Sequence, residues 1–201
     1  MRQIPLKAAF AMIGAVVLAL GACETPPPMK TYPPISFKNE APIRLNVDEI
    51  TVVQDYTPPG VAPNVDQLFP VSPVETALRW GKERLVAAGT GTGNRAEYIV
   101  HDASVTETAL KRETGLTALM TKEQAERYDA RIAVELRILN SLDQVVGKAD
   151  AEAVRTRSLA EDATINDRDQ LWYDMTKDLM TELDRQLDKT IKSVLSPYVL
   201  Q

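Results

Sequence analysis

Few side chains in this 201-residue chain are suited to catalysis or metal binding, because it contains one histidine and one cysteine. His101 stands between Val100 and Asp102 in a stretch whose pattern predicts a strand. Neighbouring strand residues point to opposite faces, so we do not expect His101 and Asp102 to form one site. With no second histidine to share a metal and no cysteine beside it to act as a nucleophile, we predict no metal site, no cofactor and no catalytic histidine.

The cysteine, Cys23, ends the first patterned stretch of the chain. Positive charges at Arg2 and Lys7 precede an uncharged run over 8–20, and small residues come directly before the cysteine. A charged start favours the cytoplasmic side while the apolar run enters the membrane, and small residues fit the groove of a signal peptidase. The run is short for a membrane-spanning helix, which needs about 20 residues. This stretch is therefore predicted to be an export signal.

The sequence Leu20-Gly21-Ala22-Cys23 resembles the lipobox of bacterial lipoprotein signals. The resemblance implies that Cys23 receives a diacylglyceryl thioether, that the signal is cleaved before it, and that the new amino terminus is acylated with a fatty acid such as palmitate. Three acyl chains anchor a protein firmly, whereas one holds it reversibly. Glu24, in place of an aspartate, favours the outer membrane facing the periplasm, with the inner membrane as the alternative. An ordinary secretory signal, or a membrane span, with an unmodified cysteine remains the other interpretation.

Composition bounds the rest of the chain. The net charge of −5 at pH 7 gives no attraction to nucleic acid. A single cysteine excludes an internal disulfide, so stability must come from packing. Prolines are dense over 24–34 and favour an extended tether. We predict a signal peptide over 1–22, a lipidated cysteine with a proline-rich tether over 23–42, and one periplasmic domain over 43–201.

Hydrophobic periodicity predicts four strands and two helices in this domain. The segments with these patterns are strands over 43–53, 96–110, 128–138 and 145–157, and helices over 72–88 and from 166 or 167 to 196. The proline-rich stretch 56–70 is predicted to be a long ordered loop. We therefore expect an α+β fold in the order β-α-β-β-β-α. It has a four-stranded, mainly antiparallel sheet with both helices packed on one face.

The first predicted helix assigns individual side chains to the core or to solvent. Ser72 suits its amino-terminal cap, and Trp80 lies near the edge of its apolar stripe, where we expect a packing role. Arg84 is assigned to the solvent side. Gly89 is predicted to end the helix. The glycine-rich run 89–94 leaves a helix and does not open one, so we do not interpret it as a phosphate-binding loop.

The order of the elements behind a lipobox is similar to that of small two-helix, four-stranded lipoproteins of the Gram-negative envelope. These include proteins that assist lipopolysaccharide assembly and auxiliary lipoproteins of envelope transport systems. The resemblance covers about 43–198, rests on element order, and transfers no functional residue beyond the lipobox. It implies a non-enzymatic accessory or scaffold in envelope assembly or transport, attached to the membrane through acyl chains on Cys23. Such a domain docks onto an envelope protein or a lipid-like cargo.

Two other functions stay open at this stage. A lipid- or ligand-binding carrier would have a closed apolar cavity between helices and sheet, whereas a docking protein would have a filled core and an exposed apolar patch. An envelope hydrolase would need a cleft with converging polar groups, and a lone histidine argues against it.

Overall fold

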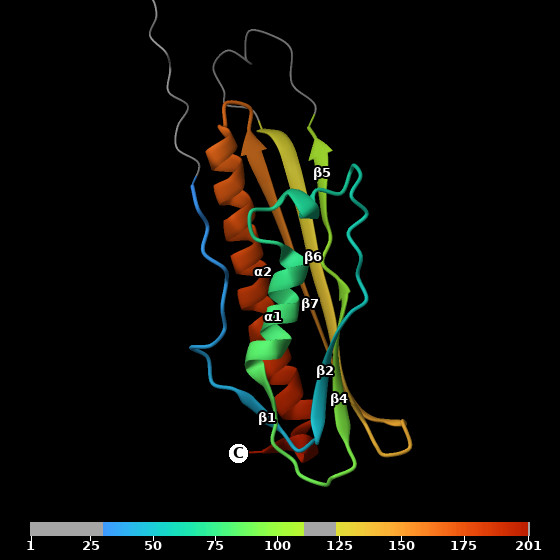
Figure 1. Ribbon diagram of the computed structural model, residues 1–201. Coiled ribbons are helices and arrows are strands. Elements are labelled where there is room, and N and C mark those ends of the chain that lie inside the picture. The colour runs from blue at the N-terminus through green and yellow to red at the C-terminus, as the bar shows by residue number, and fades with distance from the viewer. Residues whose placement is uncertain (1–29, 111–123, 201) are drawn as a thin grey trace, which may run out of the picture. The chain divides into compact units, whose positions relative to one another are not determined.

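A computed structural model describes residues 30–110 and 124–200 of the chain (Figure 1). The described residues from Thr31 onward form one compact unit. The predicted lipobox, from Leu20 to Cys23, lies outside the described residues. No helix in the described ranges is long and apolar enough to cross a membrane.

Two sheets and two α-helices make up the described part of the folded unit. The smaller sheet has the strand order β3-β1-β8; the larger has the order β2-β4-β6-β5, with β7 also paired to β6. The strands are β1 Ile43–Leu45, β2 Glu49–Gln54, β3 Leu85–Ala87, β4 Arg95–Asp102, β5 Val105–Ala109, β6 Gln124–Leu139, β7 Val145–Ala160 and β8 Val199–Leu200. The α+β class is thus confirmed, but the prediction of a single four-stranded sheet is wrong.

β6 and β7 form a long antiparallel hairpin in the larger sheet, as their alternating patterns predict. On β6, buried side chains at even positions from Tyr128 to Ile138 alternate with more exposed ones. Asp143 makes the turn between the strands with a φ of 60°, a conformation that aspartate tolerates better than most residues. One face of this sheet therefore lies against the helices while the other meets solvent.

The single strand predicted over 43–53 is two strands in different sheets. β1 pairs in parallel with β3, and β2 pairs in parallel with β4. Ile43, Leu45 and Val47 are buried, and the alternation then shifts before β2. This shift marks the point where the chain leaves one sheet and enters the other.

Helix α1 spans Pro73–Arg84 and ends before the predicted position. Its start is as expected, because the Ser72 side chain accepts a hydrogen bond from the Glu75 N–H. At its other end the residues predicted as the last helical turn form β3. The N–H groups of Ala88 and Gly89 then donate to the carbonyls of Leu45 and Val47, so pairing with the β1 segment replaces further helical hydrogen bonds.

Helix α2 spans Ile165–Val194 and is capped by Thr164, two or three residues before the predicted caps. Thr164 and Asp167 satisfy each other's backbone N–H groups in a capping box. Pro197 lies just beyond the helix in a short 3-10 turn, Ser196–Tyr198, which leads into β8. Proline cannot continue an α-helix, so the predicted stop is close to the observed one.

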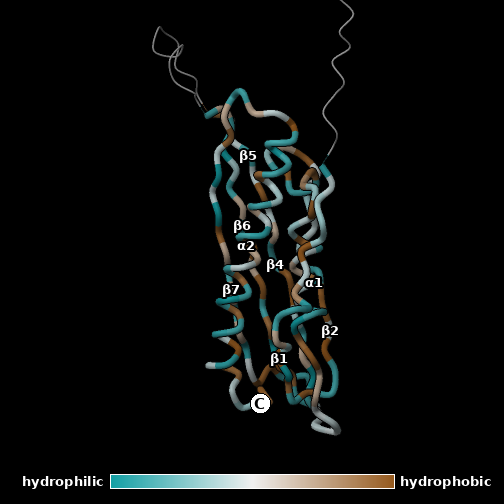
Figure 2. The backbone as a smooth tube through the Cα atoms, turned by 90° about the vertical axis from the view of Figure 1, so that its left-hand side faces the viewer, coloured by the Kyte–Doolittle hydropathy of each residue, from teal (hydrophilic) through white to brown (hydrophobic). Residues whose placement is uncertain are grey.

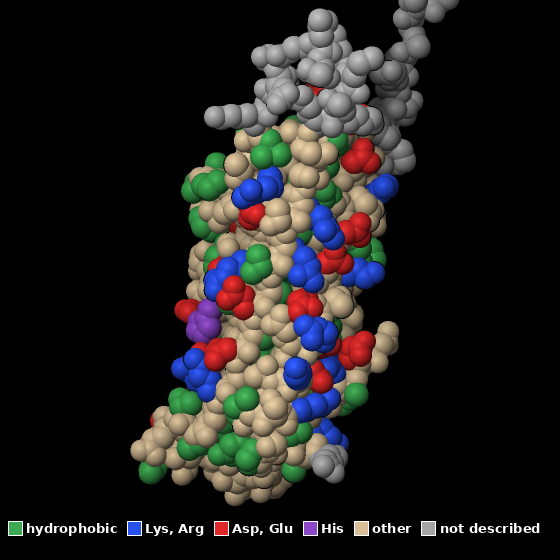
Figure 3. Space-filling model, turned by 180° about the vertical axis from the view of Figure 1, so that it is seen from behind, with side chains coloured by type: hydrophobic (Ala, Val, Ile, Leu, Met, Phe, Trp, Pro, Cys, Tyr) green, Lys and Arg blue, Asp and Glu red, His purple; other side chains and the backbone are tan. Residues whose placement is uncertain are grey.

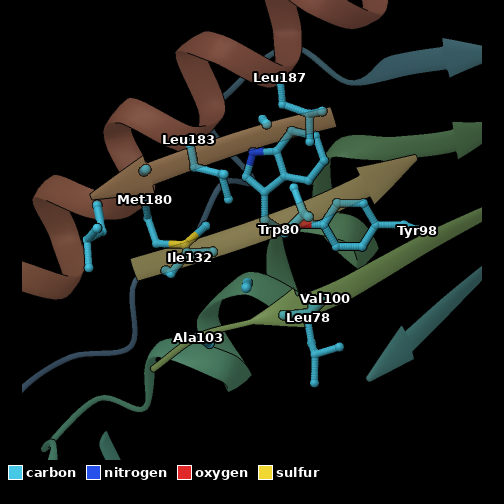
Figure 4. Packing of buried hydrophobic residues seen from close by; sticks show 14 of the residues in the cluster. Leu78, Trp80, Tyr98, Val100, Ala103, Ile132, Met180, Leu183 and Leu187 are labelled. Carbon is cyan, nitrogen blue, oxygen red and sulfur yellow. The ribbon is translucent and has the colours of Figure 1, made fainter. Parts of the chain in front are cut away.

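The space between the helices and the larger sheet is filled by large side chains (Figure 4). Trp80 of α1 and Tyr98 of β4 are fully buried, with ring centroids 5.3 Å apart. Gly81 allows this approach, since a Cβ there would lie 2.5 Å from Cδ1 of Tyr98. Hydrophobic and hydrophilic residues alternate along the elements that enclose the core (Figure 2). The packing role predicted for Trp80 agrees with this position.

Candidate functional site

The face of the larger sheet that points away from the helices, here called the outer face, carries paired charges from β4, β6 and β7. In Figure 3 basic and acidic side chains intermingle across it. Arg137 of β6 bonds Glu97 of β4 at 2.7 Å, and Lys148 of β7 bonds Glu135 at 2.9 Å. Oppositely charged residues thus face each other across neighbouring strands, which is the favourable arrangement for a solvated sheet.

His101 and Asp102 both lie on this outer face, contrary to the expectation that they point to opposite sides. The register between β4 and β6 shifts between Val100 and Asp102, so one extra residue is inserted there. His101 Nδ1 lies 2.9 Å from Asp55, and its Nε2 lies 3.5 Å from Glu135. A β-bulge breaks the alternation, and a sequence pattern for one strand does not reveal it.

Asp102 pairs with Arg131 and not with His101. On the outer face, Arg131 binds carboxylates from two neighbouring strands. Arg131 Nη1 lies 2.5 Å from Asp102, and its Nη2 lies 2.8 Å from Glu152. The hydrogen bonds to Glu152 and Asp102 raise the pKa of Arg131. In return, the bond from Arg131 holds the pKa of Glu152 below its usual value. These groups remain charged at neutral pH and are not suited to proton transfer.

Glu135 is a second residue of the outer face that contacts several charged side chains. Burial tends to raise the pKa of Glu135, but the hydrogen bond from Lys148 and the nearby charges of Lys148, His101 and Arg137 outweigh it and lower the pKa. A depression of about 410 Å³ lies between His101 and β7, floored by Ala133. Its charged lining residues, His101, Asp150 and Glu152, already take part in ion pairs, so the depression offers no unpaired charged side chain among the described residues.

A second polar cluster lies under the long loop between β2 and α1, where Asp66 is 3% exposed. Burial and then the nearby Asp66 carboxylate raise the pKa of Tyr56. Tyr56 therefore keeps its proton at neutral pH. In the described ranges, no group of three or more histidine, cysteine, aspartate or glutamate side chains is arranged to hold a metal ion.

Arg84, predicted to face solvent, is instead buried between the two helices. It is 4% exposed, its Nε lies 2.8 Å from Asp184, and its Nη2 lies 3.2 Å from Asp188. The indole N–H of Trp80 donates to the same Asp184 at 2.7 Å. The prediction fails because the two acids come from α2, about a hundred residues later in the chain.

The segment 31–42 lies on the helices. The side chain of Arg79 donates to the carbonyl of Ile35 at 3.0 Å, and Glu83 accepts the N–H of Phe37 at 2.6 Å. The Tyr32 ring packs near Tyr173 of α2, with centroids 5.1 Å apart. The described residues of the predicted tether, 31–42, therefore contact the helices of the folded unit.

Comparison with known proteins identifies no family for this chain. No family model matches it, and no curated protein matches its sequence. Solved structures with partial similarity include a minor lipoprotein from Acinetobacter baumannii, with 12% identity and a TM-score of 0.36 over 78% of this chain and 98% of that one. A Xanthomonas campestris protein of family DUF330 has 8% identity and a TM-score of 0.32 over 82% and 92%. A PelC dodecamer from Paraburkholderia phytofirmans has 12% identity and a TM-score of 0.24 over 71% and 91%. TM-scores this low do not establish a shared fold.

Proposed function

We propose that this chain is a lipid-anchored protein of the bacterial envelope, whose folded unit is a non-enzymatic accessory that binds a partner protein. The observation that carries the proposal is the motif Leu20-Gly21-Ala22-Cys23, which follows an export signal and contains the chain's one cysteine. Acyl chains on Cys23 anchor the protein, and Glu24 favours the outer membrane facing the periplasm. The folded unit then works within reach of the membrane.

Packing supports docking over carriage of a lipid-like ligand. A carrier needs an apolar cavity, and the natural place for one in this fold is between the helices and the sheet. Trp80, Tyr98 and the leucines of α2 fill that space (Figure 4). Apolar side chains that could contact a partner are instead exposed to solvent. They include Leu142, Val145 and Val146 around the β6–β7 turn.

The charges on the outer face also favour binding over hydrolysis. A hydrolase needs a nucleophile beside a base with a pKa near the working pH. His101 lies between the carboxylates of Asp55 and Glu135, and its hydrogen bond among the described residues goes to Asp55 and not to a hydroxyl. We therefore assign no catalytic residue.

Crosslinking in intact cells tests this proposal. The full-length protein is treated with a membrane-permeable amine crosslinker, purified in detergent, and analysed for bound proteins and for non-covalently bound lipid. We expect a discrete envelope protein at near-stoichiometric amount and no retained lipid beyond the detergent background. Stoichiometric lipid without any crosslinked protein would overturn docking in favour of carriage. The Cys23→Ala protein is the matched control, because loss of the anchor should reduce the crosslinked partner while the fold is kept.

A further inference from the structure

The chain enters the folded unit at one of its two ends. The ring of Tyr32 packs near Tyr173 of α2, with centroids 5.1 Å apart, and its hydroxyl donates to the carbonyl of Asn166 at 3.4 Å. Asn166 lies in the first turn of α2. In Figure 1 the start of α2 and the tip of β5 lie at the same end, here called the entry end, and the label C marks the other end.

The length of chain before Tyr32 limits how far the entry end can be from a lipid anchor. Cys23, the predicted lipidation site, is nine residues before Tyr32. At no more than about 3.6 Å per residue, these residues span about 32 Å when fully extended. Helix α2 has 30 residues and is about 45 Å long at 1.5 Å per residue. With Cys23 anchored in a bilayer, the unit therefore cannot stand on its far end, because Tyr32 would be out of reach.

Two exposed apolar side chains lie at the entry end beside α2. Ile165 is the first residue of α2 and is 77% exposed, and Leu68 in the long loop is 59% exposed. Leu68 precedes Phe69, whose ring stacks on Trp172 of α2 with centroids 4.9 Å apart. This stacking fixes the part of the loop that carries Leu68 next to the first turns of α2.

Val61, which is 66% exposed, lies in the same loop where the loop runs along β5. The N–H of Glu107 in β5 donates to the carbonyl of Pro63 at 2.9 Å. The tip of β5 pairs with β6 at Glu126, and Glu126 bonds Arg168 of α2 at 2.8 Å. These contacts connect the loop, the tip of β5 and the start of α2, so Val61 belongs to the entry end as well.

The chemistry of the entry end fits a neutral lipid surface. Exposed apolar side chains gain free energy when they leave water for the boundary between headgroups and acyl chains. Glu161 and Asp162 are exposed just before Ile165, and anionic headgroups would repel them. The outer face of the larger sheet carries ion pairs and is a less favourable surface to lay on a bilayer.

We propose that the entry end rests on the bilayer, with the side chains of Ile165, Leu68 and Val61 inserted among neutral lipid headgroups. This inference rests on the proposed lipid anchor and adds the orientation of the folded unit. The far end then points away from the membrane. It includes the β6–β7 turn, because a Cβ at Gly147 would lie 2.7 Å from the Leu195 side chain just beyond α2. The exposed apolar side chains around that turn are thus presented to a partner protein.

Fluorescence quenching in vesicles tests the contact. The full-length lipidated protein is placed in vesicles of phosphatidylethanolamine and phosphatidylcholine, in which some lipids carry a nitroxide quencher at the headgroup. Lipidated Cys23 has no free thiol, so an Ile165→Cys or Val145→Cys substitution provides one site for a nitrobenzoxadiazole label. Val145 is the control because it is 52% exposed at the far end. We expect strong quenching at position 165 and little at position 145. No quenching at 165, or equal quenching at both, would overturn the contact.

A second experiment tests whether the apolar side chains hold the entry end on the bilayer. The label is placed in a Val61→Cys protein, and Ile165→Ser with Leu68→Ser removes the other two apolar side chains. Both replaced residues are exposed, so the fold should be kept. Quenching at position 61 should fall, whereas Val145→Ser with Val146→Ser at the far end should leave it unchanged. Quenching that persists in the Ile165→Ser, Leu68→Ser protein would refute insertion of these side chains.

Lipid composition and flotation complete the test. Replacing phosphatidylcholine with anionic phosphatidylglycerol should not increase quenching at position 165, and an increase would show charge attraction in place of apolar contact. Protein that floats with the vesicles without quenching at 165 would refute the contact and leave the lipid anchor intact. Protein that stays behind with a free thiol at Cys23 would refute the anchor itself, and with it the proposed function and this orientation.

Discussion

Two arginines of this protein each bind two carboxylates in opposite surroundings. The Arg84 side chain lies between the helices and is 5% exposed, whereas that of Arg131 lies on the outer face of the sheet and is 45% exposed. An exposed ion pair contributes about 1 kcal/mol or less, but removing one partner of a buried pair costs about 3–5 kcal/mol. An arginine with two carboxylates therefore stabilises the fold at Arg84, whereas at Arg131 it mainly sets the charge of the surface.

The buried arginine also connects three parts of the chain. Its guanidinium bonds Asp184 and Asp188 of α2 and donates to the carbonyl of Ala41 in the segment 31–42. Arg84 itself ends α1, so one side chain joins both helices and the incoming segment. The ion-pair partners of Arg131, by contrast, both lie in the larger sheet, Asp102 in β4 and Glu152 in β7.

Replacing Arg84 with methionine tests the buried site, where we expect the larger loss of stability. The substitution keeps most of the side-chain volume but leaves Asp184 in a partly buried site without its cation, while Asp188 keeps its ion pair with Lys192. We expect the free energy of unfolding to fall by about 3 kcal/mol, measured by urea denaturation. A loss no larger than that of Arg131→Met would show that burial does not distinguish the two sites.

Gly81→Ala sharpens the view that the interior is filled. Alanine favours a helix by about 1 kcal/mol over glycine, but the new Cβ would lie 2.5 Å from the Tyr98 ring. Overpacking of this kind costs about 1–3 kcal/mol, so we expect a net destabilisation. In a Tyr98→Leu background the same substitution should cost less. An alanine that stabilises the unmodified protein would instead indicate free space beside Tyr98.

Arg131→Met tests the exposed site, where we expect the smaller loss of stability, and it also tests how stability depends on pH. At neutral pH we expect a change in unfolding free energy of about 1 kcal/mol or less. The pKa of Glu152, usually 4.5, is lowered in the fold, chiefly by the bond from Arg131. A group with a lowered folded-state pKa stabilises above its unfolded pKa and loses this contribution as pH falls through the folded value. Denaturation below pH 4.5 should therefore depend less on pH in the variant, and an unchanged slope would contradict this.

Sequence patterns predicted what depends on neighbouring residues. The alternation of β6 and β7, the Ser72 cap and the packing role of Trp80 follow from local spacing. Partners far along the chain were missed. The position of Arg84 on α1 is the same with or without Asp184 and Asp188 beside it. The hydrophobic periodicity of α1 therefore could not reveal that Arg84 is buried.

The alternation of residues along one strand also could not predict where strand pairing becomes irregular. The stretch 43–53 was predicted as one strand, but pairing with β3 and with β4 divides it between two sheets. The bulge at His101 depends on the register of β6, and it places His101 and Asp102 on one face. The candidate lipidation site, Cys23, was predicted from sequence alone and lies outside the described residues.

Lipid attachment is the claim on which the functional account depends most directly. Cells that express the protein are grown with radioactive palmitate, and the protein is isolated and washed free of unbound lipid. Wild type should carry the label, and Cys23→Ala should carry none. Label on the Cys23→Ala protein, or an unlabelled wild type with a free thiol, would contradict the lipid anchor at Cys23 and with it the proposed place of the folded unit at the membrane.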